Sequence, residues 1–175
     1  MRPSDEARAG PDAEPAPTYD LIELFYFAYR DFVGDADRLL EAYGFGRAHH
    51  RVLHFVARHP GLTIAELLDI LAITKQSLNR VLKELVAEVF IEVRAGAEDR
   101  RQRRLYVTSK GGDLAMKLAR SQSRRFASAM QSLGPAAKTD AAAFLLAMID
   151  REARERILAL IGAPAMEGSP CPPPA

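Results

Sequence analysis

The sequence predicts a mainly α-helical chain with a short antiparallel sheet of two or three strands. Apolar residues recur with helical spacing through most of the chain. Two short runs typical of strands, 90–94 and 105–108, flank a loop with four arginines at 95–104. Upstream, residues 63–89 contain a short helix, a turn and a longer helix. A helix-turn-helix followed by a basic hairpin is a winged helix-turn-helix, which is therefore the predicted fold.

Proline marks the two ends of the chain. Nine of the eleven prolines lie in residues 1–17 and 162–175, which we therefore expect to be disordered tails. The N-terminus lacks the apolar segment of a signal peptide, and no apolar run is long enough to span a bilayer. The single cysteine, Cys171, cannot form an internal disulfide, as is common in reducing compartments. These features predict a cytoplasmic protein that has no membrane partner.

The first predicted helix, residues 18–42, is apolar over most of its circumference near its start. Its apolar and aromatic residues are Leu21, Leu24, Phe25, Tyr26, Phe27, Ala28, Tyr29, Phe32, Leu39 and Leu40. Such a helix has to be covered on several sides, which a monomer of 175 residues could hardly do.

Capping signals place the remaining helices. A second helix is expected at 46–58, and Thr63 with Glu66 forms a capping box that opens a short third helix. Thr74 is a good N-cap for a fourth helix that ends near Val89. Thr108 or Ser109 caps a long helix to about residue 133, and one final helix spans roughly 136–161.

The fourth helix has the side chains of a DNA-reading helix. Leu78, Val81, Leu82 and Leu85 form an inward stripe. Polar and basic residues at its cap and outside this stripe are Thr74, Lys75, Gln76, Ser77, Asn79, Arg80 and Lys83. Such side chains pair with base edges and phosphates, although the same pattern occurs on ordinary solvated helix faces. The nine basic and five acidic residues of segment 71–110 favour a confined surface for a polyanion such as double-stranded DNA.

The arginine loop supplies the second half of the predicted site. Arg100, Arg101, Arg103 and Arg104 lie at or near its tip, where they face water or a polyanion. Asp99 can brace Arg101 and fix its direction, and narrow minor grooves attract such an arginine. The alternative is a solvated turn.

Four segments carry a family resemblance. They are His59-Pro-Gly-Leu-Thr-Ile-Ala-Glu-Leu-Leu68, Thr74-Lys-Gln-Ser-Leu-Asn-Arg-Val-Leu-Lys-Glu-Leu85, Glu98-Asp-Arg-Arg-Gln-Arg-Arg104 and Leu105-Tyr-Val-Thr-Ser-Lys-Gly111. Together they resemble the MarR family of bacterial transcriptional regulators, over about residues 20–160. The resemblance implies that Arg101 enters the minor groove and that Asp99 positions it. It also implies that the recognition helix meets bases and phosphates through Lys75, Gln76, Ser77, Asn79 and Arg80.

The resemblance also implies a homodimer. Long dimerisation helices at 18–45 and 111–161 would enclose a winged-helix DNA-binding domain at 46–110. Two recognition helices would then lie about one DNA turn, roughly 34 Å, apart on a pseudo-palindromic operator. One departure is Val89, where the family usually has glycine. A β-branched residue takes the left-handed cap conformation only at a cost, so the helix is expected to end differently.

Many family members bind a small aromatic effector between the dimerisation helices and the DNA-binding lobe. Residues of this chain that could contribute are Tyr26, Tyr29, Phe32, Tyr43, Phe45 and His49. The favoured alternative is that these side chains belong to the core.

Other chemistry is weakly indicated. His50 and His54 share a helix face, but no cysteine accompanies them, so they are interpreted as surface or core-edge residues and no metal is expected. Gly111-Gly112 is interpreted as a flexible cap rather than an anion site. No catalytic constellation or cofactor motif is visible, so an enzyme is disfavoured. The prediction is a DNA-binding transcriptional regulator, most simply a repressor; the alternative is a winged-helix module that binds an acidic protein.

Overall fold

The computed structural model describes residues 16–96 and 102–162, which form a mainly helical fold with a small antiparallel sheet, as predicted. The elements in order are α1 (Tyr19–Glu41), α2 (Arg47–Arg58), β1 (Leu62–Thr63), α3 (Ile64–Leu71), α4 (Lys75–Ala87), β2 (Ile91–Ala95), β3 (Arg103–Val107), α5 (Ser109–Gln131), α6 (Ala137–Met148) and α7 (Arg151–Gly162). The predicted tails at 1–17 and 162–175, with Cys171, lie almost entirely outside these residues.

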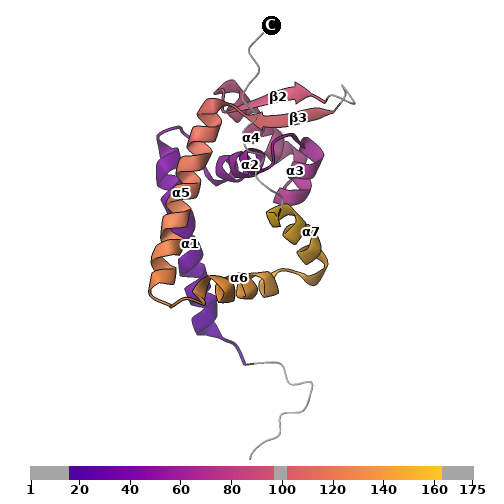
Figure 1. Ribbon diagram of the computed structural model, residues 1–175. Coiled ribbons are helices and arrows are strands. Elements are labelled where there is room, and N and C mark those ends of the chain that lie inside the picture. Colours follow the sequence, from indigo (N-terminus) through magenta and orange to yellow (C-terminus); the bar gives the residue numbers. More distant parts are fainter. Residues whose placement is uncertain (1–15, 97–101, 163–175) are drawn as a thin grey trace, which may run out of the picture.

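The elements form two parts, a lobe and a frame that consists of α1, α5, α6 and α7 (Figure 1). Helices α2, α3 and α4 and the sheet make up the lobe, while α1 and α5 run away from it side by side. An ion pair between Arg125 Nε and Asp35 Oδ2, 2.5 Å apart, joins α1 and α5. At the far end α6 crosses over, and α7 turns back toward α3.

The sheet has the strand order β1-β3-β2, with both pairings antiparallel. In the hairpin, Ile91 pairs with Val107 and Ala95 with Arg103, while Leu62 of β1 pairs with Leu105. Strand β3 begins at Arg103, so two of the four arginines lie on a strand rather than in the loop.

The core lies inside the lobe. The predicted inward stripe of α4 is buried, and Phe90 at the start of the hairpin is only 1% exposed. Helices α2, α3 and the first half of α5 close the core through Leu53, Leu67 and Leu114. Burial of this single apolar stripe determines which face of α4 reaches solvent.

The predicted caps are present. Thr63 Oγ1 accepts from the Glu66 amide, while the Glu66 carboxylate accepts from the Thr63 amide, 2.7 Å away. Thr74 Oγ1 accepts from Ser77 N, and Thr108 Oγ1 accepts from Gly111 N. These side chains fix the first residues of α3, α4 and α5.

The end of α4 corrects the expectation for Val89. This valine takes the left-handed conformation, with φ +59°, as a glycine would. Val89 N donates to Val86 O, 3.0 Å away, and Phe90 N donates to Leu85 O, 2.8 Å away. This is the Schellman pattern, and burial of both Phe90 and Leu85 in the core offsets the strain at the valine. The helix therefore ends as it would with glycine.

The single final helix expected at 136–161 is wrong, because it breaks into α6 and α7 at Ile149, which has ψ 140°. Arg154 Nε donates to Ile149 O, and Ala153 N donates to Asp150 O, so that α7 starts afresh. Aspartate is favoured at the residue before a helix, so Asp150 is a sequence signal for this new start.

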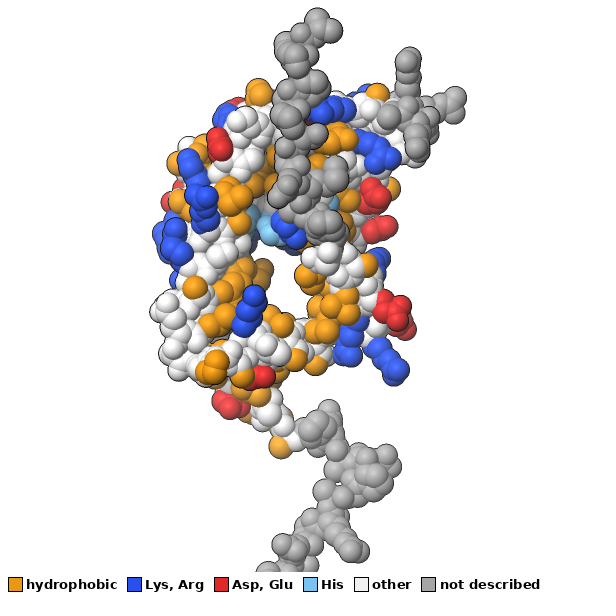
Figure 2. Space-filling view, in the orientation of Figure 1, with side chains coloured by type: hydrophobic (Ala, Val, Ile, Leu, Met, Phe, Trp, Pro, Cys, Tyr) orange, Lys and Arg blue, Asp and Glu red, His pale blue; other side chains and the backbone are white. Residues whose placement is uncertain are grey.

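Apolar surface is left exposed on α1, α6 and α7. The large exposed side chains of these helices are Tyr19, Leu21, Ile22, Leu24, Phe25, Tyr26, Phe27, Tyr29, Leu39, Phe144, Leu145, Met148, Leu158 and Ile161. Hydrophobic side chains surround the opening between the lobe and α6 in Figure 2. No helix in residues 16–96 and 102–162 is long and apolar enough to cross a membrane.

Candidate DNA-binding surface

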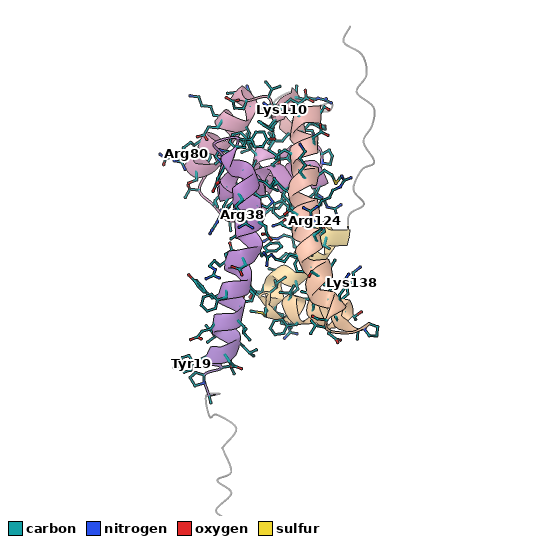
Figure 3. The ribbon with its side chains drawn as sticks, turned by 90° about the vertical axis from the view of Figure 1, so that its left-hand side faces the viewer. Tyr19, Arg38, Arg80, Lys110, Arg124 and Lys138 are labelled. Atoms are coloured by element: carbon teal, nitrogen blue, oxygen red, sulfur yellow. The ribbon has the colours of Figure 1, made fainter. Side chains whose placement is uncertain are left out.

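The polar face of α4 is fully presented to solvent. Lys75, Gln76, Ser77, Asn79, Arg80 and Lys83 are all exposed. At 100° per residue, Gln76, Arg80 and Lys83 lie on the side of the helix opposite the buried leucine and valine stripe. Figure 3 shows Arg80 at the outer edge of the lobe. The lobe thus projects one helix face whose donors and acceptors are available to a partner.

Thr74 differs from its neighbours because its hydroxyl is occupied. Its Oγ1 accepts from Ser77 N at 3.2 Å and donates to Ser77 Oγ at 2.9 Å. These bonds start α4 and restrain the Ser77 side chain. Of the predicted α4 residues, Thr74 has the clearest structural role.

The tip of the hairpin, with Asp99, Arg100 and Arg101, lies outside the described residues. The described base of the hairpin closes through Gly96 N, which donates to Gln102 O at 2.8 Å. Arg103 is exposed, whereas Arg104 donates to Gly61 O at 3.2 Å and to Gln102 Oε1 at 3.4 Å. Arg104 is thus tied to the turn before β1.

A shallow groove joins α4 to the hairpin base. It has a volume of about 420 Å³ and is lined by Thr63, Ile64, Ala65, Leu68, Lys75, Gln102 and Arg103. Lys75 and Arg103 place two cations around it. A groove with cations on two elements is suited to the phosphate backbone of a nucleic acid.

The junction between the hairpin and α5 depends on Gly111, which the sequence reasoning missed. A Cβ at Gly111 would lie 2.0 Å from Phe90 O and 2.9 Å from Phe90 C. At Gly112 the nearest atom to such a Cβ would be 3.9 Å away. The interpretation of Gly111 as a flexible cap is therefore wrong, because it allows a close backbone approach. The only sequence signal was its spacing from Thr108.

Two further side chains strengthen this junction. Thr108 Oγ1 donates to Val89 O at 2.7 Å, and Lys110 Nζ donates to Glu88 O at 2.9 Å. The Lys110 ammonium also lies 4.1 Å from the centre of the Phe90 ring. The carbonyls at the end of α4 are thereby held by residues that begin α5, and the helix and hairpin form one unit.

The six residues predicted for an effector cleft fall into separate groups. Tyr26 and Tyr29 are exposed on α1, and Phe32 contacts Phe126 of α5 with ring centres 5.3 Å apart. The other three, Tyr43, Phe45 and His49, stack in sequence between α1, α2 and α4. A cavity of about 590 Å³ lies elsewhere, and none of the six lines it. Its lining is His54, Phe55, Leu62, Glu66, Asp69, Ile70, Arg156, Ile157, Leu160 and Ile161.

The histidines of α2 have structural partners. His49 Nε2 lies 2.7 Å from Glu84 Oε2, and the His50 and His54 ring centres are 6.4 Å apart. Burial lowers the pKa of His50 and of His54, which favours their neutral forms. Within the described ranges, no three or more His, Cys, Asp and Glu side chains gather as a metal site.

Comparison with known proteins gives a consistent result. The model of the MarR family matches residues 43–102. The chain is 45% identical over 129 residues to the HTH-type transcriptional regulator PetP of Rhodobacter capsulatus, covering 74% of this chain and 78% of that protein. It is 31% identical over 95 residues to an uncharacterized HTH-type transcriptional regulator of Staphylococcus aureus strain Mu50, covering 54% of this chain and 65% of that one.

Solved structures share the fold. The transcriptional regulator SlyA aligns with a TM-score of 0.64 at 18% identity, covering 81% of this chain and 99% of that chain. The reduced form of MarR from E. coli aligns with a TM-score of 0.57 at 19% identity, covering 77% and 96%.

Proposed function

Since the chain belongs to the MarR family of helix-turn-helix transcriptional regulators, we propose that it represses transcription by binding a pseudo-palindromic operator as a homodimer. The observation that carries this proposal is the exposed polar face of α4, which lies opposite a buried apolar stripe. Such a face can enter a major groove without any rearrangement of the lobe. As a regulator of bacterial genes, the protein would act in the cytoplasm.

The proposed contacts divide by element. Lys75, Gln76, Ser77, Asn79, Arg80 and Lys83 of α4 would read bases and bind flanking phosphates. From the hairpin, Arg101 would enter the minor groove with Asp99 beside it, while Arg100 and Arg103 would bind phosphates. Thr74 and Arg104 would act mainly by holding α4 and the hairpin base, which their hydrogen bonds support.

The homodimer would form through segments 18–45 and 111–161, with 46–110 as the DNA-binding domain. Support comes from the exposed apolar side chains of α1, α6 and α7, among them Leu24 at 64% and Ile161 at 63% exposure. Monomeric proteins rarely expose large apolar patches, and exposed large apolar side chains are numerous on these three helices. A second copy would cover it and set two α4 helices one DNA turn apart.

A small aromatic effector would relieve repression by binding one dimer geometry better than the other. The cavity between α7 and the lobe supports this part, because its volume of about 590 Å³ suits a small molecule. The six aromatic and histidine residues named from the sequence stay a prediction.

The test is retention of genomic DNA fragments by the purified protein at about 150 mM salt, followed by sequencing of the bound fraction. Selective enrichment of fragments with a common pseudo-palindrome is the expected result. Lys75→Ala should weaken operator binding and reduce the slope of log affinity against log salt by about 1. Lys138→Ala removes the same charge at the far end of the frame (Figure 3) and should leave both unchanged.

The same experiment distinguishes the regulator from the alternative function. A winged-helix module that binds an acidic protein would retain DNA without sequence preference. If no fragment is enriched, the regulator proposal fails and the interaction module takes its place.

A further inference from the structure

A continuous row of contacts links the end of α1 to α4. Phe45 N donates to Leu40 O of α1 at 3.2 Å, which fixes Phe45 directly after the helix. The His49 ring stacks on Phe45, with centres 4.6 Å apart and an interplanar angle of 11°. His49 then reaches Glu84 of α4 at 2.7 Å. Each step joins a different element, so the row crosses from the frame into the lobe.

The hydrogen bonds of His49 define its geometry. Its Nδ1 accepts from the Gly46 amide at 3.1 Å, so the ring hydrogen belongs on Nε2, which donates to Glu84 Oε2. The His49 side chain is only 12% exposed, whereas that of Glu84 is 47% exposed. The buried ring is thus fixed by stacking and by two hydrogen bonds, and it presents a rigid donor to a freer carboxylate.

Glu84 lies where it can control the rotation of α4. It stands one turn after Arg80 and two turns after Ser77, on the flank of the helix between the buried stripe and the exposed face. A rotation of 10° about the helix axis moves a side chain at roughly 6 Å radius by about 1 Å. Such a shift is enough to spoil the geometry of a hydrogen bond to a base edge.

We propose that His49 is a positioning residue for DNA recognition, which sets the rotation of α4 through Glu84 and connects it to the end of α1. The inference rests on the proposed function, since α4 matters as the helix that reads DNA. Neighbouring rings support the arrangement, because Tyr43 and Phe45 both meet Phe90 edge-on at the junction with the hairpin. A movement of α1 in the dimer therefore has a direct mechanical route to the recognition helix.

The first test measures specificity. His49→Leu should lower affinity for the operator about tenfold and leave affinity for random DNA unchanged, with the same salt slope, because no phosphate contact is lost. His59→Leu makes the same chemical change at the C-cap of α2, about 15 Å from His49, and should behave as the wild type. Equal loss on operator and random DNA would overturn the proposal, since a merely structural defect would act on both.

A double-mutant cycle tests the coupling to Glu84. Once His49 is leucine, adding Glu84→Ala should cause no further loss of specificity, and Glu84→Gln, which still accepts from Nε2, should retain most of it. If the two losses multiply, the residues act independently and the proposal is wrong.

Amide hydrogen exchange separates this inference from the proposed function. Without any DNA, His49→Leu should speed exchange in residues 75–87 of α4, while His59→Leu should not. If the wild type binds no operator, the regulator proposal fails, yet the exchange result still decides whether His49 holds α4. Unchanged exchange in α4 would remove the positioning role even where DNA binding holds.

Discussion

Replacement of Gly111 by alanine should weaken the junction on which the position of the hairpin depends. The new Cβ would lie 2.0 Å from Phe90 O, about 1.4 Å closer than ordinary van der Waals contact allows. Phe90 cannot step aside freely, because its carbonyl accepts from Thr108 N at 3.1 Å and its amide donates to Leu85 O at 2.8 Å. Relief of the clash therefore has to shift the start of α5 away from the end of α4.

The magnitude follows from three effects. Overpacking of a core costs about 1–3 kcal/mol, and a backbone clash belongs at the upper end of that range. Loss of a backbone hydrogen bond adds about 1 kcal/mol. Alanine gains about 1 kcal/mol over glycine in a helix. The net expected loss is about 3 kcal/mol, or roughly 6–12 °C in Tm for a chain of this size.

Urea and thermal unfolding followed by circular dichroism measure this loss. Gly112→Ala is the matched control, because its Cβ would meet nothing closer than 3.9 Å and it gains the same helix propensity. We expect Gly112→Ala to be as stable as the wild type or more stable by up to about 1 kcal/mol. If both variants melt together with the wild type, the close approach at Gly111 does not exist.

Three other predictions address the rest of the chain. Val89→Gly should raise the free energy of unfolding by about 0.5–1 kcal/mol, because glycine takes φ +59° without strain. Val86→Gly, within α4, should lower it. A less stable Val89→Gly variant in urea titrations would show that Val89 does not have this left-handed conformation. Phe25→Glu places a charge on the exposed apolar face of α1 and should give monomers in sedimentation velocity, and an intact dimer would refute a dimer interface there. Hydrogen bonds from Thr63 lower the pKa of Glu66, so the contribution of Glu66 to stability is present above pH 4.5 and is lost as the pH falls through the lowered pKa. Glu66→Gln should therefore reduce the loss of Tm at acid pH. An unchanged dependence of Tm on pH would show that Glu66 does not contribute in this way.

Local signals explain why most of the fold could be predicted. The starts of α3, α4 and α5 follow from Thr63, Thr74 and Thr108, whose side chains bond amides three residues ahead. Such caps need no tertiary information. The break between α6 and α7 was missed because the apolar run 141–149 continues up to it, so that periodicity alone favours one helix.

Features that depend on contacts between distant segments were not predictable in this way. Strand β1 has two residues and exists only because β3 lies beside it. Glu84 is 35 residues from His49, and their contact follows from the packing of α2 on α4. For the candidate site, residue types on α4 were enough to predict its exposed face, whereas the tie between Arg104 and Gly61 required the turn to be in place.

Helix α4 is bracketed by two residues in an unfavourable backbone conformation. Ala72 before it has φ +50° and Val89 after it has φ +59°, and neither is glycine. Each costs about 1 kcal/mol or more, so both persist only because their surroundings are fixed by burial of Leu71 and Phe90.

Ends held in this way limit sliding of α4 along its own axis, and the His49–Glu84 contact limits its rotation about that axis. A regulatory change in DNA binding would then need the least free energy if it altered the spacing of two lobes through the exposed faces of α1, α6 and α7. The His49–Glu84 contact couples the orientation of α4 within one lobe to the position of α1, because it attaches the flank of α4 to the end of α1. Loss of that contact should therefore change specificity within one lobe, whereas loss of the apolar faces should abolish cooperative binding to the two half-sites.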